Sequence, residues 1–474
     1  MSSVTSEKND ENIKQSKSRP ERDLTVGSPI KLIVAFAVPM ILGNLLQQLY
    51  NFVDTMIVGH FLGVQALAGV GATGSINFLI VGFCIGICSG FAIPVAQRFG
   101  AKDYVSLRKY VANATYLSVV FSALMTVVVS ILCRQILLWM RTPEDIIDYS
   151  YVYILTIFFG IPVTFLYNLL AGIIRAIGDS KTPLYFLMIS TVVNLFLDYT
   201  FIAQLGLGIF GAAFATVLSQ LVSGILCLIV IVKRFTVLHV SGDEWKIDVE
   251  YMKMLCKMGL PMGLQYSITA IGSVILQSSV NMLGSIAVAA ITAANKINML
   301  FMCILDALGG TMATYGGQNL GAGRIDRIRK GTMTAVLIGF AYSVIAFVAA
   351  YFVRVPLIML FVDRPIPEMV DMAALQIIIT MGSMCTLVLV NVLRFLIQGV
   401  GFSGLAVLAG VSEMIARTIA GLVIIPAFGF LGACVAGPLA WIFADMFLIP
   451  AYIYVMKKLE IRINKAHTEF DSPY

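Results

Sequence analysis

Long apolar segments separated by short polar breaks fill the chain from about residue 31 to residue 456. Many of them exceed the ~18–20 residues that an α-helix needs to cross the apolar core of a bilayer. The first half predicts six membrane-spanning helices, at 31–57, 63–96, 111–133, 146–172, 183–204 and 208–232. The second half predicts six more, at 254–283, 286–316, 331–353, 370–398, 404–427 and 430–456. The pattern therefore predicts an all-α polytopic membrane protein with about twelve membrane-spanning helices.

The composition places most of the chain in lipid. Hydrophobic residues make up 59% of the 474 residues and charged residues only 12%, whereas a soluble domain has about 25% charged residues. The net charge of +6 comes from loops and termini, so we do not expect nucleic-acid binding. The eight cysteines form no CxxC pair and the three histidines show no metal-ligand spacing, so no zinc or redox site is predicted.

Basic residues gather in every second polar break and at both termini, for example at Arg98, Lys233 and Arg324. The alternate breaks have few basic residues. The break at 399–404 is the exception, because the base nearest to it is Arg394. Short loops rich in Lys and Arg stay on the cytoplasmic side. We therefore expect a multi-pass protein of the cell membrane, with both termini cytoplasmic and no cleavable signal.

Three short motifs recur in the second half, 221 or 222 residues after their first occurrence. The pairs are Pro39-Met40 with Pro261-Met262, Gly100-Ala101 with Gly321-Ala322, and Gly208 to Ala212 with Gly429 to Ala433. The repeat predicts two pseudo-symmetric six-helix lobes, inserted the same way up and related by an axis along the membrane normal. The expected parts are a tail at 1–30, a first lobe at 31–232, a linker at 233–253, a second lobe at 254–456 and a tail at 457–474.

Ionisable residues inside membrane spans are costly and by default mark function. Asp54 lies in the first predicted helix, and Thr216 lies in the sixth. Asn194 and Asp198 are four residues apart in the fifth, so a helix places them on one face. These hard oxygen ligands suit Na⁺, or a proton shared between the two acids. The alternative is that Asp198 only hydrogen-bonds Asn194 and that Asp54 only caps a helix end near Gly59.

Three more acidic residues lie at membrane depth. Asp306 has no partner on its own helix, and it either lines a cleft that attracts cations or forms buried hydrogen bonds. Glu413 precedes Arg417 by four residues, which favours a structural ion pair. Asp445 receives no role. The candidates for a substrate cleft are Asp306, Glu413, Tyr50 and Asn51.

The sequence offers no catalytic constellation. Gly178 to Thr182 resembles the end of a phosphate-binding loop, but the upstream glycine and strand are missing. We find no catalytic dyad and no stretch long enough for a nucleotide-binding domain, so we expect neither an enzyme nor a resident cofactor. Gly82, Gly86 and Gly90 form tandem GxxxG patterns, which predict close helix packing.

Together these segments resemble the multidrug and toxic compound extrusion (MATE) transporters over about residues 25–460. The motifs that carry the resemblance are Pro39-Met40, Leu49 to Asp54 with Ile57 to Gly59, the Gly100-Ala101 and Gly321-Ala322 loops, Arg175 to Pro183, and Asn194 to Asp198. The resemblance implies twelve helices in two lobes and drug export driven by sodium or proton entry.

One branch of the family uses a first-lobe cation site whose residues match Asp54, Asn194, Asp198 and Thr216. Another branch uses a glutamate on the seventh helix and an aspartate on the tenth, and this sequence has neither. The resemblance therefore implies ion-binding acids in the first lobe only.

We accordingly expect a secondary active antiporter that exports drugs and other, often cationic, organic compounds in exchange for Na⁺ or H⁺ by alternating access. The runner-up is a lipid-linked glycan flippase of the same superfamily; a channel or a membrane-embedded enzyme ranks lower. The expected partners are small-molecule substrates and the lipid bilayer, with a coupling Na⁺ as the sole metal, and the chain is expected to function as a monomer.

Overall fold

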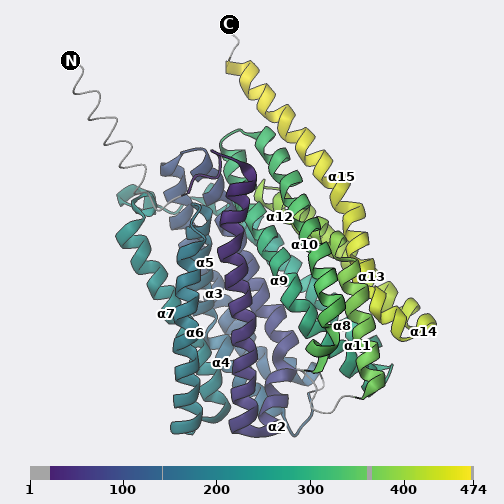
Figure 1. Ribbon diagram of the computed structural model, residues 1–474. Helices are drawn as coiled ribbons and strands as arrows, with labels where there is room; N and C mark the ends of the chain where they lie inside the picture. Colours follow the sequence, from purple (N-terminus) through teal and green to yellow (C-terminus); the bar gives the residue numbers. More distant parts are fainter. Residues whose placement is uncertain (1–21, 141, 360–365, 471–474) are drawn as a thin grey trace.

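The computed structural model describes residues 22–140, 142–359 and 366–470, and these ranges contain helices and no β-strand (Figure 1). Ten helices are long and apolar enough to cross a membrane, and two bent helix pairs bring the number to twelve. The predicted all-α polytopic architecture is therefore confirmed. Residues 1–21 of the predicted tail at 1–30, and residues 471–474 of the tail at 457–474, lie outside the described residues.

The first six spans lie close to their predicted positions. Helix α2 (Pro29–Gly100) holds two of them, because the backbone of Gly63 leaves the helical region at φ 83° and separates Pro29–Gly63 from Gln65–Gly100. The others are α3 (Tyr104–Trp139), the pair α4 (Ile147–Phe159) and α5 (Ile161–Ala176), α6 (Lys181–Asp198) followed by the π-helix η1 (Tyr199–Gln204), and α7 (Gly208–Arg234).

The second half repeats this order after two short 3₁₀ turns, η2 (Thr236–Leu238) and η3 (Gly242–Trp245). Its elements are α8 (Val249–Asn281), α9 (Ser285–Gly321), α10 (Ile325–Met359), the pair α11 (Pro367–Gly382) and α12 (Met384–Gly399), α13 (Ser403–Ile419), the π-helix η4 (Ala420–Ile424), α14 (Ile425–Phe428) and α15 (Phe430–Phe470). Each half thus has a π-helical segment within its fifth span, which covers Lys181–Gln204 in the first half and Ser403–Phe428 in the second.

The fourth span of each half is bent, by 48° between α4 and α5 and by 49° between α11 and α12. The sequence predicted 146–172 and 370–398 as single uninterrupted spans. At the first bend, Gly160 packs so closely on α7 that a Cβ atom there would lie 2.4 Å from Val217 Cγ2. Pro162 is the second residue of α5, and its missing N–H suits the first turn of a helix.

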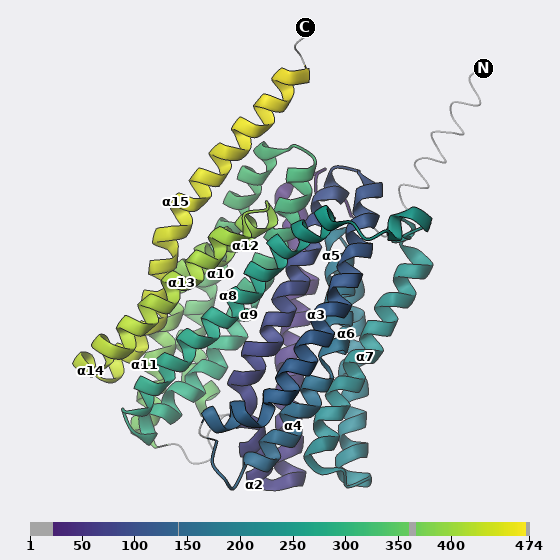
Figure 2. The ribbon, with the colours of Figure 1, turned by 180° about the vertical axis from the view of Figure 1, so that it is seen from behind.

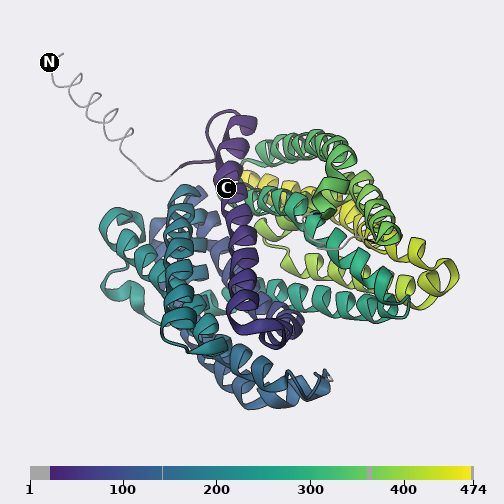
Figure 3. The same cartoon turned by 60° about the horizontal axis from the view of Figure 1, so that its bottom comes forward.

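The helices form two groups, α3 to α7 and α8 to α15, and α2 lies between them and packs against both (Figure 3). The predicted glycine repeat makes this possible. A Cβ on Gly86 would lie 2.6 Å from the carbonyl oxygen of Met262, and one on Gly90 would lie 2.5 Å from the Cα of Gly259. The predicted close packing is confirmed, and its partner is α8 of the other lobe.

The two lobes contact each other at the end of the molecule that holds both termini, and their helices diverge toward the opposite end (Figures 1 and 2). At the terminal end the repeated motifs meet: Gly100 packs against the backbone of Gln318, and Gly321 against that of Gln97. The side chain of Gln97 also donates to Gly399 O at 2.9 Å. The structure therefore closes this end by backbone contact between the lobes.

The segment before α2 ties the two lobes together. Leu24 is fully buried in the core of the second lobe, its N–H donates to Gln318 Oε1 at 2.9 Å, and its carbonyl accepts from Arg327. Gln318 Nε2 in turn donates to Ala176 O of the first lobe at 2.8 Å. The N-H of Arg22 donates to Ile177 O at 3.2 Å. Residues 22–28, named here the N-terminal strap, thus bridge both lobes.

Candidate functional site

The structure brings the predicted acids of the first lobe together. Asp54 lies within the first span of α2, and Asn194 and Asp198 lie at the end of α6. Asp54 is 7% exposed, and Asn194 and Asp198 are fully buried. The carboxyl groups of Asp54 and Asp198 are close enough to interact directly. Two acids far apart in the sequence therefore share one site between α2 and α6.

The polar atoms of this site are buried without hydrogen-bond partners. They are Asp54 Oδ1, both carboxyl oxygens of Asp198, and Oδ1 and Nδ2 of Asn194. The hydrogen bond from Asn194 to Asp198, which was the alternative role for these residues, is not formed. The helix also continues past Gly59 as far as Gly63, so Asp54 does not cap a helix end. Unpaired buried polar atoms of this kind cost several kcal/mol unless a ligand satisfies them.

Thr216 and Tyr50 close one side of the site. The hydroxyl of Tyr50 donates to Thr216 Oγ1 at 3.1 Å, and Thr216 donates to Ala212 O at 3.1 Å. Tyr50, predicted only as a cleft residue, interacts electrostatically with Asp54 and Asp198. Its place follows from the helix, because Tyr50 lies one turn before Asp54.

Tyr153 of α4 also interacts with both carboxyl groups, and sequence reasoning missed it. It is one of several tyrosines at the start of the fourth span, and no spacing or motif distinguishes it from the others. The π-helix η1 starts directly after Asp198, and such segments often occur at functional sites. That signal depends on backbone geometry, which the sequence does not reveal.

The chemistry of the site fits a hard cation or a proton. No Lys or Arg among the described residues acts on Asp54 or Asp198, so two charged carboxylates there would have no counter-ion. A shared proton or a bound Na⁺ would supply the missing positive charge, and the carboxylate, amide and hydroxyl oxygens are suitable ligands. Within the described residues no cluster of three or more His, Cys, Asp or Glu side chains occurs.

Of the four predicted cleft residues, only Tyr50 takes part in this site. Asn51 is exposed on α2. Asp306 is exposed on α9 and accepts a hydrogen bond from Asn391 Nδ2 of α12 at 3.0 Å. The partner that the sequence did not provide for Asp306 therefore comes from another helix. An exposed carboxylate held by an amide remains available to a ligand.

Glu413 is buried, at 3% exposure. Its carboxylate pairs with Arg417 at 3.5 Å, as predicted, and also with Arg394 of α12. The sequence placed Arg394 nearest to the loop at 399–404, but the structure buries it inside the second lobe. Because two guanidinium groups enclose Glu413, its place agrees with the predicted ion pair rather than with a substrate cleft.

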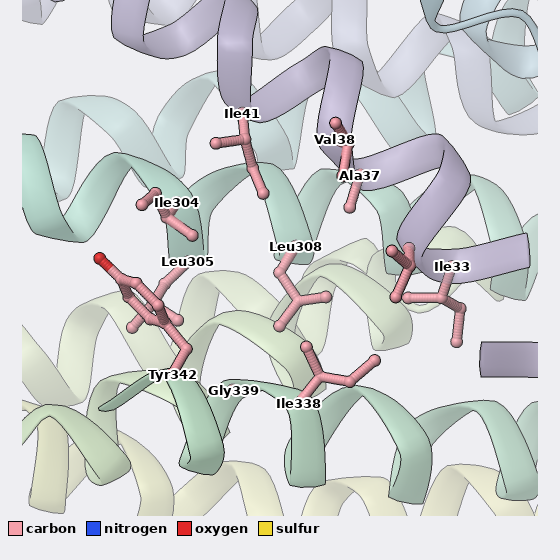
Figure 4. Close-up of a pocket in the computed structure, with 11 residues that line it drawn as sticks. Ile33, Ala37, Val38, Ile41, Ile304, Leu305, Leu308, Ile338, Gly339 and Tyr342 are labelled. Carbon is pink, nitrogen blue, oxygen red and sulfur yellow. The ribbon is translucent and has the colours of Figure 1, made fainter. Parts of the chain in front are cut away.

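An apolar cavity of about 180 Å³ lies between α2, α9 and α10 (Figure 4). Its lining includes Ile33 and Ile41 of α2, Leu308 of α9 and Ile338 of α10. Tyr342 also contributes, but its hydroxyl is used in a hydrogen bond to Phe301 O at 3.0 Å. None of the predicted site residues lines this cavity, so it is separate from the acidic site.

A family model described as MatE matches the chain twice, over residues 39–200 and 261–423, which together exceed half of its length. The two matches fall on the two halves of the internal repeat.

Two named transport and resistance proteins and one solved structure are also similar to this chain. The probable multidrug resistance protein YoeA of Bacillus subtilis is 30% identical over 346 residues, covering 72% of this chain and 73% of YoeA. A FAD transporter of Shewanella oneidensis is 22% identical over 351 residues, covering 73% of this chain and 77% of the transporter. A solved structure of a multidrug resistance MATE family transporter in an outward-facing conformation has the same fold, with a TM-score of 0.86, 21% identity, and coverage of 92% of this chain and 98% of the other.

Proposed function

Because the chain belongs to the MatE family of multidrug efflux transporters, we propose that it is a secondary active antiporter that exports drug-like organic compounds in exchange for Na⁺ or H⁺. The observation that carries the proposal is the buried pair of Asp54 and Asp198. Asp54 Oδ1 and both carboxyl oxygens of Asp198 lack donors, and no Lys or Arg among the described residues acts on the pair. The coupling ion is itself transported, so the proposal includes no resident cofactor. The chain is proposed to work as a monomer.

The proposed orientation of the protein in the membrane follows from the distribution of its basic residues. The basic loops around Arg98, Lys233 and Arg324 lie at the end that holds both termini, because the chain crosses the bundle an even number of times between them. The positive-inside tendency makes this end cytoplasmic. In the proposed cycle the present conformation, closed at that end, faces outward. The ion enters and the drug leaves on the outer side.

Helix α2 provides a physical link between ion binding and the lobe contacts. Its first span holds Asp54, and its second span holds Gly86 and Gly90, which pack against α8 of the other lobe. An ion that neutralises Asp54 and Asp198 draws α2 and α6 together, since it removes the repulsion between the two carboxylates. A shift of α2 then changes the contact between lobes. Coupling therefore requires a preference of the ion-bound state for one lobe arrangement.

The substrate preference is proposed to be cationic. Asp306 is exposed and accepts a hydrogen bond from the neutral amide of Asn391, and the buried Arg394 acts on it only electrostatically. A carboxylate in this setting attracts organic cations. The relative named a FAD transporter makes an anionic dinucleotide the appropriate competing probe.

The experiment is transport in proteoliposomes with an imposed Na⁺ or H⁺ gradient. An ethidium-type dye is the cationic probe, and FAD is the anionic probe. The wild type is compared with Asp54→Asn and Asp198→Asn, and with Asp371→Asn as a control, because Asp371 is an exposed acid outside the site. We expect gradient-driven dye transport in the wild type and the control, and a loss of at least about tenfold in the other two variants.

Full gradient-driven transport by both Asp54→Asn and Asp198→Asn would contradict the assignment of these two residues to the ion-binding site. A wild type that moves no dye under either gradient would count against drug export. Dye flux that only dissipates a gradient would indicate a channel.

A further inference from the structure

The second lobe holds a buried cluster of charged side chains that the proposed transport mechanism does not use. Arg394 of α12 and Asp445 of α15 are each 6% exposed, and Glu413 of α13 is 3% exposed. Arg417, one turn after Glu413, completes the cluster. Its guanidinium is also fixed from α8, since Nη1 donates to Thr269 O at 3.1 Å.

The hydrogen bonds of this cluster leave one donor and one carboxyl group unmatched. Glu413 pairs with both Arg394 and Arg417. The Nε–H group of Arg394 is buried and has no acceptor, and both carboxyl oxygens of Asp445 are buried and have no donor. Asp445 is nevertheless close enough to interact electrostatically with Arg394 and Glu413. A free donor and a free acceptor therefore occur within the same buried cluster.

The charges of the cluster explain how this arrangement is stable. Two guanidinium groups and one carboxylate leave a net charge of +1 on Arg394, Arg417 and Glu413. Asp306 of α9 also acts on Arg394, but it is exposed and does not belong to the buried cluster. An ionised Asp445 would balance that charge, but without a hydrogen bond its own burial would be expensive. A protonated Asp445 avoids that cost. The observed pairing is the one expected when Asp445 carries a proton.

We propose that Asp445 is a second proton-binding group of this transporter, and that its protonation decides which carboxylate Arg394 pairs with. When the carboxylic acid of Asp445 releases its proton to water, the resulting carboxylate accepts hydrogen bonds from Arg394. Glu413 then keeps Arg417 as its partner. Reprotonation of Asp445 returns Arg394 to Glu413. Every buried charge has a partner in both states.

The surroundings select a proton over a metal cation. Arg394 acts on Asp445 directly, whereas Arg417 pairs with Glu413 and does not act on Asp445. No other charged group of the described residues on α8, α10, α11 or α15 acts on Asp445, and Glu368 and Asp371 of α11 are exposed. A positive guanidinium repels Na⁺ but does not prevent the binding of a proton to a carboxylate. The first-lobe site differs, because no Lys or Arg acts on it.

The test is an infrared pH titration of the purified full-length protein, read at the carbonyl stretch of protonated carboxyl groups. Asp54 and Asp198 could share a proton and give the same band, so every protein in the titration carries Asp54→Asn and Asp198→Asn. This parent protein is compared with the further changes Asp445→Asn and Glu413→Gln and with the exposed-site control Asp371→Asn. We expect a band at neutral pH that disappears at alkaline pH in the parent and in the Asp371→Asn control. The band should be missing in Asp445→Asn, which replaces the carboxyl group by an amide of the same size.

Glu413→Gln tests the exchange of partners and does not depend on the folding of the Asp445 variant. It frees Arg394 to pair with Asp445, so the neutral-pH band should disappear although Asp445 is present. A band that survives Asp445→Asn would overturn the assignment, and a band that survives Glu413→Gln would overturn the exchange. The role in transport rests on the proposed antiport function, but the titration requires no transport. Its failure is therefore distinct from a failure of the dye assay.

Discussion

The hydroxyl of Tyr50 donates a hydrogen bond to Thr216 Oγ1 at 3.1 Å and so connects α2 with α7 beside the buried acids. Thr216 uses its own proton to bond Ala212 O. A hydroxyl oxygen has two acceptor positions, and Tyr50 takes one of them. One lone pair of Thr216 is therefore left for a cation, which makes this residue a sensitive probe of the transported ion.

Replacing Thr216 by valine should separate the two coupling ions. The change removes one oxygen ligand and keeps the shape, so we expect the Na⁺ concentration for half-maximal transport to rise about tenfold, equivalent to about 1.4 kcal/mol. Transport driven by H⁺ should change little, because the proton is held by carboxyl groups. The measurement is dye transport against Na⁺ concentration and, separately, against an imposed pH difference. Equal losses under both gradients would contradict the ligand role of Thr216.

Gly90 should control the closed contact between the lobes. In Gly90→Ala the new Cβ would lie 2.5 Å from the Cα of Gly259, so the helices must separate at a cost of roughly 1–3 kcal/mol. We expect spin labels at positions 181 and 330, one on each lobe at the terminal end, to show longer and broader distances. Gly74→Ala is the control, because a Cβ there meets nothing within 4 Å. Identical distance distributions in both variants would refute the steric explanation.

Gln318 should act as a latch between the lobes. In Gln318→Ala the N–H of Leu24 and the carbonyl of Ala176 both lose their side-chain partner, at roughly 1–3 kcal/mol for each buried group. We expect the terminal end to open more often, with the same pair of spin labels as readout and a lower midpoint of thermal unfolding. Gln277→Ala removes only an exposed bond to Asn281 and should leave both quantities unchanged. A latch role is wrong if the two variants behave alike.

Glu244 should stabilise the folded structure of the linker at 233–253, and this stabilisation should depend on pH. Arg108 Nε donates to both of its carboxylate oxygens at 2.8 Å, and this hydrogen bonding lowers the pKa of Glu244 from 4.5 to about 2. Because the pKa of Glu244 is lower in the folded protein than in the unfolded chain, its ionised carboxylate stabilises the folded state. This contribution is complete above pH 4.5 and is lost as the pH falls toward 2.

Hydrogen exchange of the amides at 241–246 measures this effect. We expect faster exchange in Glu244→Gln than in the wild type near neutral pH, and a difference that shrinks below pH 4.5. Asp243→Asn is the control, since the side chain of Asp243 is 89% exposed. A difference that persists unchanged at the lowest pH would exclude the Arg108 pair as its cause.

Asp306 should set the charge preference of the transported compound. In Asp306→Asn the carboxylate is lost while an amide can still meet Asn391. We expect export of cationic dyes to fall several-fold while export of uncharged dyes is retained, because the attraction is electrostatic. Competition between a cationic and a neutral dye in the same vesicles gives the ratio directly. A proportional loss of both dyes would show a structural role instead.

Much of the fold was predictable, because lipid exposure forces long apolar segments and because duplication leaves paired motifs. Asp54, Asn194 and Asp198 could be predicted as a group, since acids at membrane depth are rare and a spacing of four residues fixes a helix face. The bends at Gly160 and Ser383 could not, since the apolar pattern continues through them. The pairing of Arg394 with Glu413 was not predicted, because partner choice between helices depends on packing that one-dimensional spacing does not contain. Tyr153 stayed hidden among similar tyrosines for the same reason.

The burial of Leu24 in the second lobe has a consequence for biosynthesis. Within the strap, Leu24 finds its hydrogen-bond partners Gln318 and Arg327 on α9 and α10. The ribosome delivers these residues about 300 positions later. The first lobe can therefore insert and fold early, but Leu24 cannot reach its buried position until more than two thirds of the polypeptide has been made. Docking of the strap thus marks a late step in assembly, and it connects the beginning of translation with the joining of the two halves.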